Sequence, residues 1–228
     1  MIKIKQILIG LILSQALYAE DLLVFLPGDI DAAKVQSEIS KSTDLNVKAF
    51  DKIKDLEKEA ETNKSAYIIA PFPYADAEGY DVLMNGYKGA DKGEKYMLVT
   101  ANAALSADGL SDKRLGIYDV MGRKTIKKFL KSNFAIDGAK LKTVNKKEDL
   151  LTLLGIDAVD VIVVSEGDLE DIKKTSKVAL KVLKQSAGDI GYPVVAAPKG
   201  ADKGKVASLS KVSKGFLNKF SFDSWRVK

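Results

Sequence analysis

The sequence predicts an α/β protein built as two lobes with a ligand cleft between them. Three observations support this prediction. Short apolar runs alternate with short amphipathic runs in both halves of the chain, a pattern typical of parallel strands joined by crossover helices. Residues 96–131 read as a strand, a polar connector, a second strand, a tight loop and a helix. The length of 228 residues allows two small domains, each with its own core.

The predicted strands are apolar or β-rich runs that end at turn residues. Residues 22–26 form a continuous apolar run, typical of a buried parallel strand, and Pro27 and Gly28 end it. The complete set of predicted strands is 22–26, 45–50, 65–70, 80–84, 96–100, 115–120, 140–144, 160–165, 178–183 and 193–197.

The predicted helices lie between these strands. Asp29 is expected to cap a helix that ends near Ser42. Residues 53–61 form a charged amphipathic run with Ile53 and Leu56 on its apolar face. The remaining predicted helices are 125–131, 147–154, 169–174 and 205–216.

The polar connector 101–114 is expected to be the hinge between the lobes. The first lobe would then comprise residues 20–100, with a C-terminal return over residues 198–228. The second lobe would comprise residues 115–197. Ligands of such folds bind at the carboxyl ends of the strands, so we expect the site to lie where the two lobes meet.

The composition moves the expected function away from catalysis. The chain has no cysteine and no histidine, which excludes thiol and Ser-His-Asp hydrolases and removes the commonest transition-metal ligands. We therefore expect no enzymatic activity, no metal site and no cofactor. The net charge of +5 comes from lysines that are interspersed with nearly as many acids, which argues against a nucleic-acid partner.

Residues 1–19 have the features of a secretory signal peptide. Lys3 and Lys5 precede a short apolar core that is too short to span a bilayer as an anchor. Cleavage is expected after Ala19, with Ala16 as the alternative. A cysteine-free exported chain suits the periplasm of a Gram-negative bacterium better than a eukaryotic secretory route.

The sequence KGADKG occurs twice, at residues 88–93 and 199–204. The two copies are either equivalent loops on lobes related by pseudo-symmetry or independent solvated turns. We favour independent turns, because no similarity extends into the flanking residues.

Three segments carry a resemblance to a known family. The run 96–119 resembles the hinge passage of type II periplasmic solute-binding proteins, and in particular that of the phosphate/phosphonate-type group. Segments 150–170 and 192–216 resemble later parts of the same group, so that the likeness covers most of residues 21–220. The residues of the hinge passage at comparable places are Ser106, Leu110, Lys113, Arg114, Leu115, Gly116, Tyr118 and Asp119.

The resemblance implies a two-lobed type II fold and a soluble periplasmic protein that closes on a small solute. It implies an anionic solute, phosphate/phosphonate-like or an organic acid, delivered to an inner-membrane ABC permease or a sensor, and a monomeric state. The small-hydroxyl loop of the group is replaced here by residues 120–125, of which Gly122 and Thr125 keep part of the chemistry. The alternative is an accessory or sensory partner-binding protein of the same fold.

The first candidate site is the start of the helix after strand 115–120. The free N–H groups of Gly122, Arg123, Lys124 and Thr125 would bind an anion, with the Arg123 side chain as a bidentate partner. An ordinary strand-to-helix turn is the alternative interpretation.

A stiff aromatic loop follows strand 65–70. Its residues Pro71, Phe72, Pro73 and Tyr74 could stack on a ligand or donate a hydrogen bond to it. Packing of this loop against its own lobe is the alternative.

Polar residues at strand ends complete the candidate site. They are Thr100, Asn102, Asp119, Ser165 and Glu166. Any of them could instead be a helix cap, and Asp119 together with Glu166 would suit a cation, which leaves the sign of the ligand open. The single tryptophan, Trp225, is expected to anchor the C-terminal tail by packing.

Overall fold

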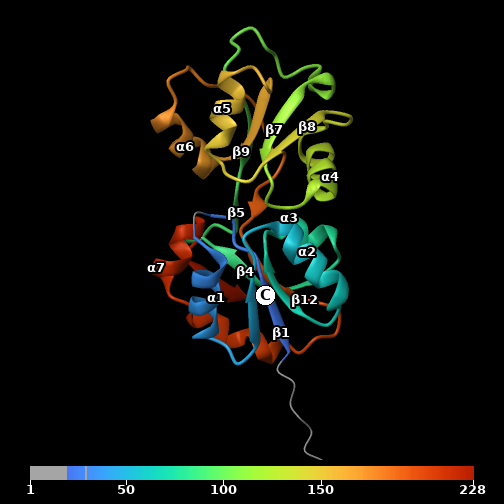
Figure 1. Cartoon of the computed structure of the whole chain (residues 1–228), viewed down its shortest axis with the longest axis vertical. Coiled ribbons are helices and arrows are strands. Elements are labelled where there is room, and N and C mark those ends of the chain that lie inside the picture. The colour runs from blue at the N-terminus through green and yellow to red at the C-terminus, as the bar shows by residue number, and fades with distance from the viewer. Residues whose placement is uncertain (1–19, 29) are drawn as a thin grey trace, which may run out of the picture.

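The computed structural model describes residues 20–28 and 30–228, and shows two lobes joined by a narrow neck (Figure 1). The expected signal peptide, residues 1–19, and the expected helix cap Asp29 lie outside the described residues. Among the helices of the described part, none combines the length and the apolar character that crossing a membrane requires.

The first lobe contains a six-stranded sheet in the order β13-β4-β12-β3-β1-β2. Its strands are β1 (Asp21–Val24), β2 (Asn46–Ala49), β3 (Tyr67–Ala70), β4 (Asp81–Tyr87), β12 (Val194–Ala197) and β13 (Ser224–Val227). Its helices are α1 (Ala32–Ser40), α2 (Ile53–Thr62), α3 (Phe72–Ala77) and α7 (Lys214–Leu217), with 3-10 segments at Lys203–Lys211 and Asn218–Phe220. The strands β1, β2 and β3 are parallel, whereas β12 and β13 pair antiparallel.

The alternation of side chains along β1 produces two apolar layers in this lobe. Leu22 packs in a cluster with residues of α1 and the C-terminal segments, and Leu23 packs on the other face with α2 and α3. Trp225 is 2 % exposed and its indole N–H donates a 3.0 Å hydrogen bond to the carbonyl of Pro193. The expected packing role of this tryptophan is confirmed.

The second lobe contains a five-stranded sheet in the order β10-β6-β9-β7-β8. Its strands are β6 (Tyr96–Thr100), β7 (Arg114–Tyr118), β8 (Lys140–Val144), β9 (Val161–Ser165) and β10 (Lys181–Gln185). Its helices are α4 (Arg123–Phe134), α5 (Asp149–Gly155) and α6 (Glu166–Thr175), with a 3-10 turn at Leu110–Asp112. Helices α5 and α6 cover one face of the sheet, and α4 covers the other.

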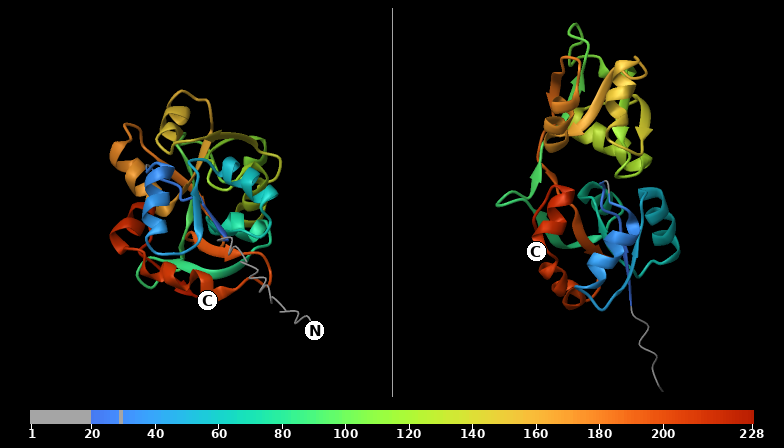
Figure 2. Two further views of the ribbon diagram at one scale, coloured as in Figure 1. Left: turned by 60° about the horizontal axis from the view of Figure 1, so that its bottom comes forward. Right: turned by 60° about the vertical axis from the view of Figure 1, so that its left-hand side comes forward.

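The neck is a two-stranded antiparallel ribbon of β5 (Gly93–Glu94) and β11 (Ile190–Gly191), seen from the side in Figure 2. A Cβ on Gly93 would overlap the carbonyl of Ile190, and a Cβ on Gly191 would lie 2.9 Å from the Phe72 ring. Glycine at both positions therefore allows the two crossing segments to lie against each other and against α3.

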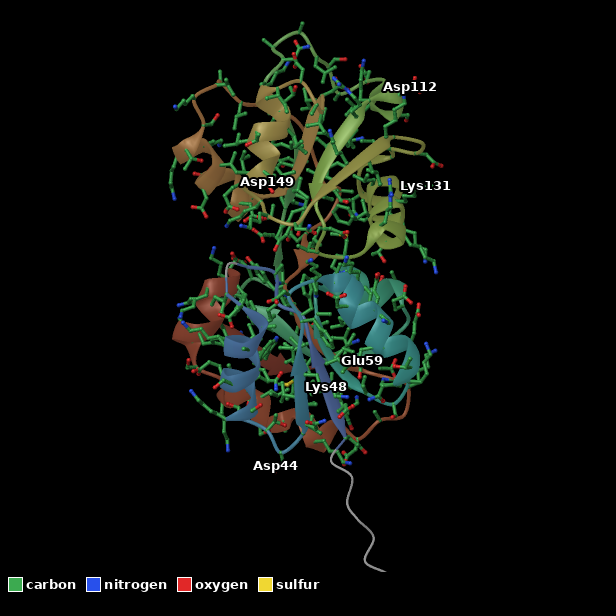
Figure 3. All side chains as sticks on the ribbon, in the orientation of Figure 1. Asp44, Lys48, Glu59, Asp112, Lys131 and Asp149 are labelled. Carbon is green, nitrogen blue, oxygen red and sulfur yellow. The ribbon has the colours of Figure 1, made fainter. Side chains whose placement is uncertain are left out.

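The structure differs from the expected boundaries of the lobes. Strand β6 pairs with β9 and β10, so the chain has already entered the second lobe at Tyr96. Strand β12 belongs to the first lobe, although residues 115–197 were expected to be the second. The segment 101–114 is a surface connector at the end of the second lobe remote from the neck, where Asp112 is labelled in Figure 3.

The structure differs from the predicted elements in three further respects. Both sheets are mixed rather than parallel, because the two crossings of the neck bring strands back in the opposite direction. Pro71 and Pro73 stand at the start of helix α3 rather than in a loop, since proline fits the first helical turn. The expected helix 205–216 is a 3-10 segment followed by α7, which Ser213 caps by accepting a 3.2 Å hydrogen bond from Phe216 N–H.

Candidate functional site

A cavity of about 120 Å³ lies between the two lobes and the neck, and we call it the cleft cavity. The segments that follow β1, β3, β7 and β9 all contribute to its lining, as expected for a site at the carboxyl ends of strands. This volume suits a small solute or several water molecules. The polar side chains of its lining are Glu94, Tyr96, Tyr118, Lys147, Ser165, Asp168, Tyr192, Lys219 and Ser221.

Glu94 is the carboxylate that the neck brings to the cleft cavity. Its Oε2 accepts a 3.0 Å hydrogen bond from the backbone N–H of Gly167 in the first turn of α6. Burial raises the pKa of Glu94, and the Gly167 N–H and the Ser165 hydroxyl oppose this by hydrogen bonding to the carboxylate. The side chain therefore connects the neck to the second lobe and presents an acidic group at the cavity.

An ion pair lies beside Glu94 on the wall formed by the second lobe. Lys147 Nζ is 3.3 Å from Asp168 Oδ1 and 3.9 Å from Asp171 Oδ2. The Ser165 hydroxyl caps α6 by accepting a 3.1 Å hydrogen bond from the Asp168 N–H. The charge of Asp168 is therefore balanced within the protein.

Three tyrosines add aromatic surface to the cleft cavity. The ring of Tyr96 meets Phe129 edge-to-face with centroids 5.2 Å apart, and the ring of Tyr192 stacks on Phe222 at 6.5 Å. Burial raises the pKa of Tyr96 and raises that of Tyr192 to about 12. Both hydroxyls are therefore neutral donors at physiological pH, and the rings offer faces to an apolar or cationic group.

Part of the sequence-predicted site lies in a second space, a cavity of about 540 Å³ that we call the side cavity. It lies between α2 and α3 of the first lobe and the start of α4, and its lining includes Tyr74, Arg123 and Lys124. Tyr74 is 3 % exposed, and burial raises its pKa, with smaller contributions from Tyr80 and nearby glutamates.

The predicted anion site at the start of α4 is surrounded by carboxylates. The N–H of Gly122 donates a 3.1 Å hydrogen bond to Asp119 Oδ1. A Cβ on Gly122 would overlap the carboxylate of Glu57 from α2. Burial raises the pKa of both Asp119 and Glu57. The start of the helix is therefore next to two acidic groups of the protein itself.

The other predicted residues are dispersed. Thr100 is fully buried at the end of β6 remote from the neck, where its hydroxyl donates a 2.8 Å hydrogen bond to the Asp160 carbonyl. Asn102 follows it and caps its own loop by accepting a 2.9 Å hydrogen bond from Ala104 N–H. These two residues lie outside the cleft cavity because strand β6 begins, rather than ends, at the neck.

Of the remaining predicted residues, Pro71, Pro73 and Ser165 line the cleft cavity. Phe72 packs against Gly191 of the neck, and Thr125 is buried in α4.

Glu166 is the exposed first residue of α6. The polar cavity residues absent from the sequence prediction are Glu94, Tyr96, Tyr118, Lys147, Asp168, Tyr192, Lys219 and Ser221. No local sequence pattern marked the two crossings of the neck that bring these residues to the cavity.

Comparison with known proteins shows the fold. No family model and no curated protein sequence matches this chain. A Xanthomonas citri protein solved with bound ATP is similar with a TM-score of 0.64 at 10 % identity, over 92 % of this chain and 91 % of that one. A binding protein component of an ABC phosphonate transporter from Pseudomonas aeruginosa gives 0.63 at 14 % identity, over 92 % and 81 %.

The substrate-binding protein of an amino acid ABC transporter gives a TM-score of 0.55 at 16 % identity, over 89 % of this chain and 96 % of that one. These similarities confirm the expected two-lobed type II periplasmic-binding-protein-like fold. At these identities they establish the architecture, and the ligand has to be argued from the residues of this chain.

Proposed function

We propose that this chain is a periplasmic solute-binding protein that closes its two lobes on a small solute in the cleft cavity and delivers it to an ABC-type importer. The observation that carries the proposal is the convergence of charged, aromatic and hydroxyl groups from both lobes and the neck on one cavity. Solved structures of the same fold include binding components of phosphonate and amino acid transporters, which supports the same role here.

The proposed solute is a small organic acid that also carries an amino group. Glu94 supplies a carboxylate held by neutral donors, and the three tyrosine rings add surface that attracts a cation, so this end suits an ammonium group. Lys219 lies at the opposite wall, in the first lobe, and suits the acidic group. A phosphate-like solute is a weaker fit, because Glu57 and Asp119 already surround the start of α4.

The proposed mechanism is hinge closure about the neck. Lys219 belongs to the first lobe, and Lys147 and Ser165 belong to the second. A solute that contacts both walls makes its full set of contacts only when the lobes are closed, so binding stabilises the closed arrangement. Two adjacent backbone crossings, β5 and β11, are the segments that would absorb the rotation.

A thermal-shift screen tests this function. The purified protein is heated with amino acids, other amino-substituted acids, simple organic acids and inorganic phosphate. The proposal predicts a higher melting temperature with at least one amino-substituted acid. Stabilisation by phosphate alone would keep the solute-binding role and overturn the proposed solute class. No shift with any solute, together with co-purification of a stable protein partner, would favour the accessory or sensory alternative.

A further inference from the structure

The side cavity lies where α2 and α3 of the first lobe approach the start of α4 (Figure 1). It is separate from the cleft cavity, because no described residue lines both. Its volume of about 540 Å³ is enough for a small organic molecule. The charged residues of its lining are Glu57, Glu61, Glu78, Lys64, Arg123, Lys124 and Lys199.

The three carboxylates of this lining have no partner in the protein. Glu57 and Glu61 lie one turn apart on α2, and Glu78 ends α3. Within the part of the chain that the structure describes, none of the three makes an ion pair or a side-chain hydrogen bond. Glu59 of the same helix, by contrast, pairs with Lys48 at 3.0 Å, and Figure 3 labels both.

These carboxylates repel one another. Burial raises the pKa of Glu57, and repulsion from Asp119 and from the other two carboxylates of the lining raises it further. The four basic residues of the lining are exposed, and among the described residues none of them lies within ion-pair distance of these carboxylates. A cation that entered the cavity would therefore relieve a repulsion that the protein leaves uncompensated.

A buried tyrosine indicates an occupant independently of the acids. Tyr74 is only 3 % exposed, yet its hydroxyl makes no hydrogen bond with any described residue. No fully buried polar side-chain atom in the described ranges lacks a partner, so this hydroxyl reaches open space, which is the side cavity. Burial raises the pKa of Tyr74, and the charged or polar groups that raise it further all line the same cavity. The neutral hydroxyl can accept a hydrogen bond from an ammonium group.

The arrangement suits an organic cation rather than a metal ion. Among residues 20–28 and 30–228, no three acidic side chains stand close enough together to hold a metal ion. The carboxylates are instead distributed over two walls, α2 and the end of α3. Ala60 and the rings of Tyr74 and Tyr80 add apolar surface to the lining, and tyrosine rings attract cations.

We propose that the side cavity is a second binding site, which takes a small alkyl diamine. One ammonium group would pair with Glu57 or Glu61 on α2, and the other with Glu78 at the end of α3. The alkyl chain between them would lie against the tyrosine rings. This site is distinct from the cleft cavity, and its occupation does not depend on the solute proposed there.

Isothermal titration calorimetry with putrescine, a four-carbon diamine, tests the site at low ionic strength. The proposal predicts binding to the wild type, and weaker binding of butylamine, which has a single ammonium group. Glu57→Gln and Glu78→Gln each change one wall and should each weaken putrescine binding roughly 10-fold, the effect of losing a hydrogen bond between charged groups. Two such variants keep the test decisive if one of them fails to fold. Tyr74→Phe keeps the ring and should have a smaller effect in the same direction.

Glu59→Gln is the matched control, because it removes an acid of the same helix that does not line the side cavity, and the affinity should be unchanged. No binding of millimolar putrescine to the wild type would overturn the proposal, as would equal affinities of the wild type and the folded wall variants. Binding that is lost in Glu94→Gln and kept in Glu57→Gln would place the diamine in the cleft cavity, and would overturn the proposal as well.

Discussion

Glu94 Oε2 lies 3.0 Å from the backbone nitrogen of Gly167 and accepts its hydrogen bond, which places a carboxylate of the neck at the first turn of α6. The residue thus belongs to the segment that connects the lobes and also lines the cleft cavity. A solute bound to Glu94 would contact the part of the chain about which the lobes rotate, and this relationship couples binding to closure in our account.

The first prediction concerns this carboxylate. Glu94→Gln keeps the size of the side chain and removes its charge, so an amino-bearing solute should bind roughly 10- to 100-fold more weakly, the usual effect of losing a hydrogen bond to a charged group. Isothermal titration calorimetry with the solute identified by the thermal-shift screen measures the change. Glu166→Gln is the control, because that exposed carboxylate is outside the cleft cavity. Equal affinities of Glu94→Gln and the wild type would remove Glu94 from the site.

The second prediction concerns the close approach of the two strands in the neck. Gly93→Ala places a methyl group on the carbonyl of Ile190, so the free energy of unfolding should fall by about 1–3 kcal/mol, the usual cost of overpacking. Urea denaturation followed by circular dichroism measures it. Gly155→Ala, where a Cβ would meet nothing within 4 Å, should change the stability by less than about 0.5 kcal/mol. A neutral Gly93→Ala would mean that the strands of the neck are further apart than described.

The third prediction concerns Trp225, which fixes β13 against the first lobe. Trp225→Ala should cost about 3–5 kcal/mol of stability, because it empties a fully buried site. Trp225→Phe keeps the ring and loses the hydrogen bond to Pro193, so about 1 kcal/mol is expected. Unfolding is followed by circular dichroism rather than by tryptophan fluorescence, since both substitutions remove the only tryptophan of the chain. A small effect of the alanine variant would contradict the anchoring role.

The fourth prediction concerns the pH dependence of the ion pair between Arg114 and Asp160. Hydrogen bonding to Arg114 lowers the pKa of Asp160 from 3.8 to about 2. A carboxyl with a lowered pKa in the folded state stabilises that state above its unfolded pKa, and this stabilisation is lost as the pH falls towards the folded pKa. The melting temperature of Asp160→Asn should therefore be lower than that of the wild type above a pH of about 4, and the difference should narrow towards a pH of about 2.

Asp137→Asn is the control for this pH series. Its partner Lys131 and Asp137 itself are 68 % and 73 % exposed, so their ion pair should contribute little at any pH. A constant difference between the wild type and Asp160→Asn from neutral to acidic pH would contradict the assigned pKa.

The sequence predicted the local elements well where apolar periodicity decides them. The run 22–26 overlaps β1 at residues 22–24, and the pattern of Ile53 and Leu56 predicted the buried face of α2. The position of the hinge was not predictable in this way, since it depends on the pairing of residues 93–94 with residues 190–191, almost a hundred positions later. Local patterns carry no information about such a pairing.

The candidate site was predictable only in part for the same reason. Ser165 lines the cleft cavity because β9 ends at the neck, as its apolar run before a polar turn suggested. Thr100 also ends an apolar strand, yet β6 runs antiparallel to β9 and ends on the opposite side of the lobe. The strand direction that separates these two residues is set by the crossing of the neck, which a strand's own sequence does not encode.

The central claim is that a small solute binds between the lobes, and native mass spectrometry of the protein tests it most directly. The protein is incubated with a millimolar mixture of amino-substituted acids and then sprayed without denaturation. Our account predicts a 1:1 adduct with one of these acids, and predicts that Glu94→Gln abolishes it. The bare mass of the chain alone, or an adduct that persists equally in Glu94→Gln, would contradict the account.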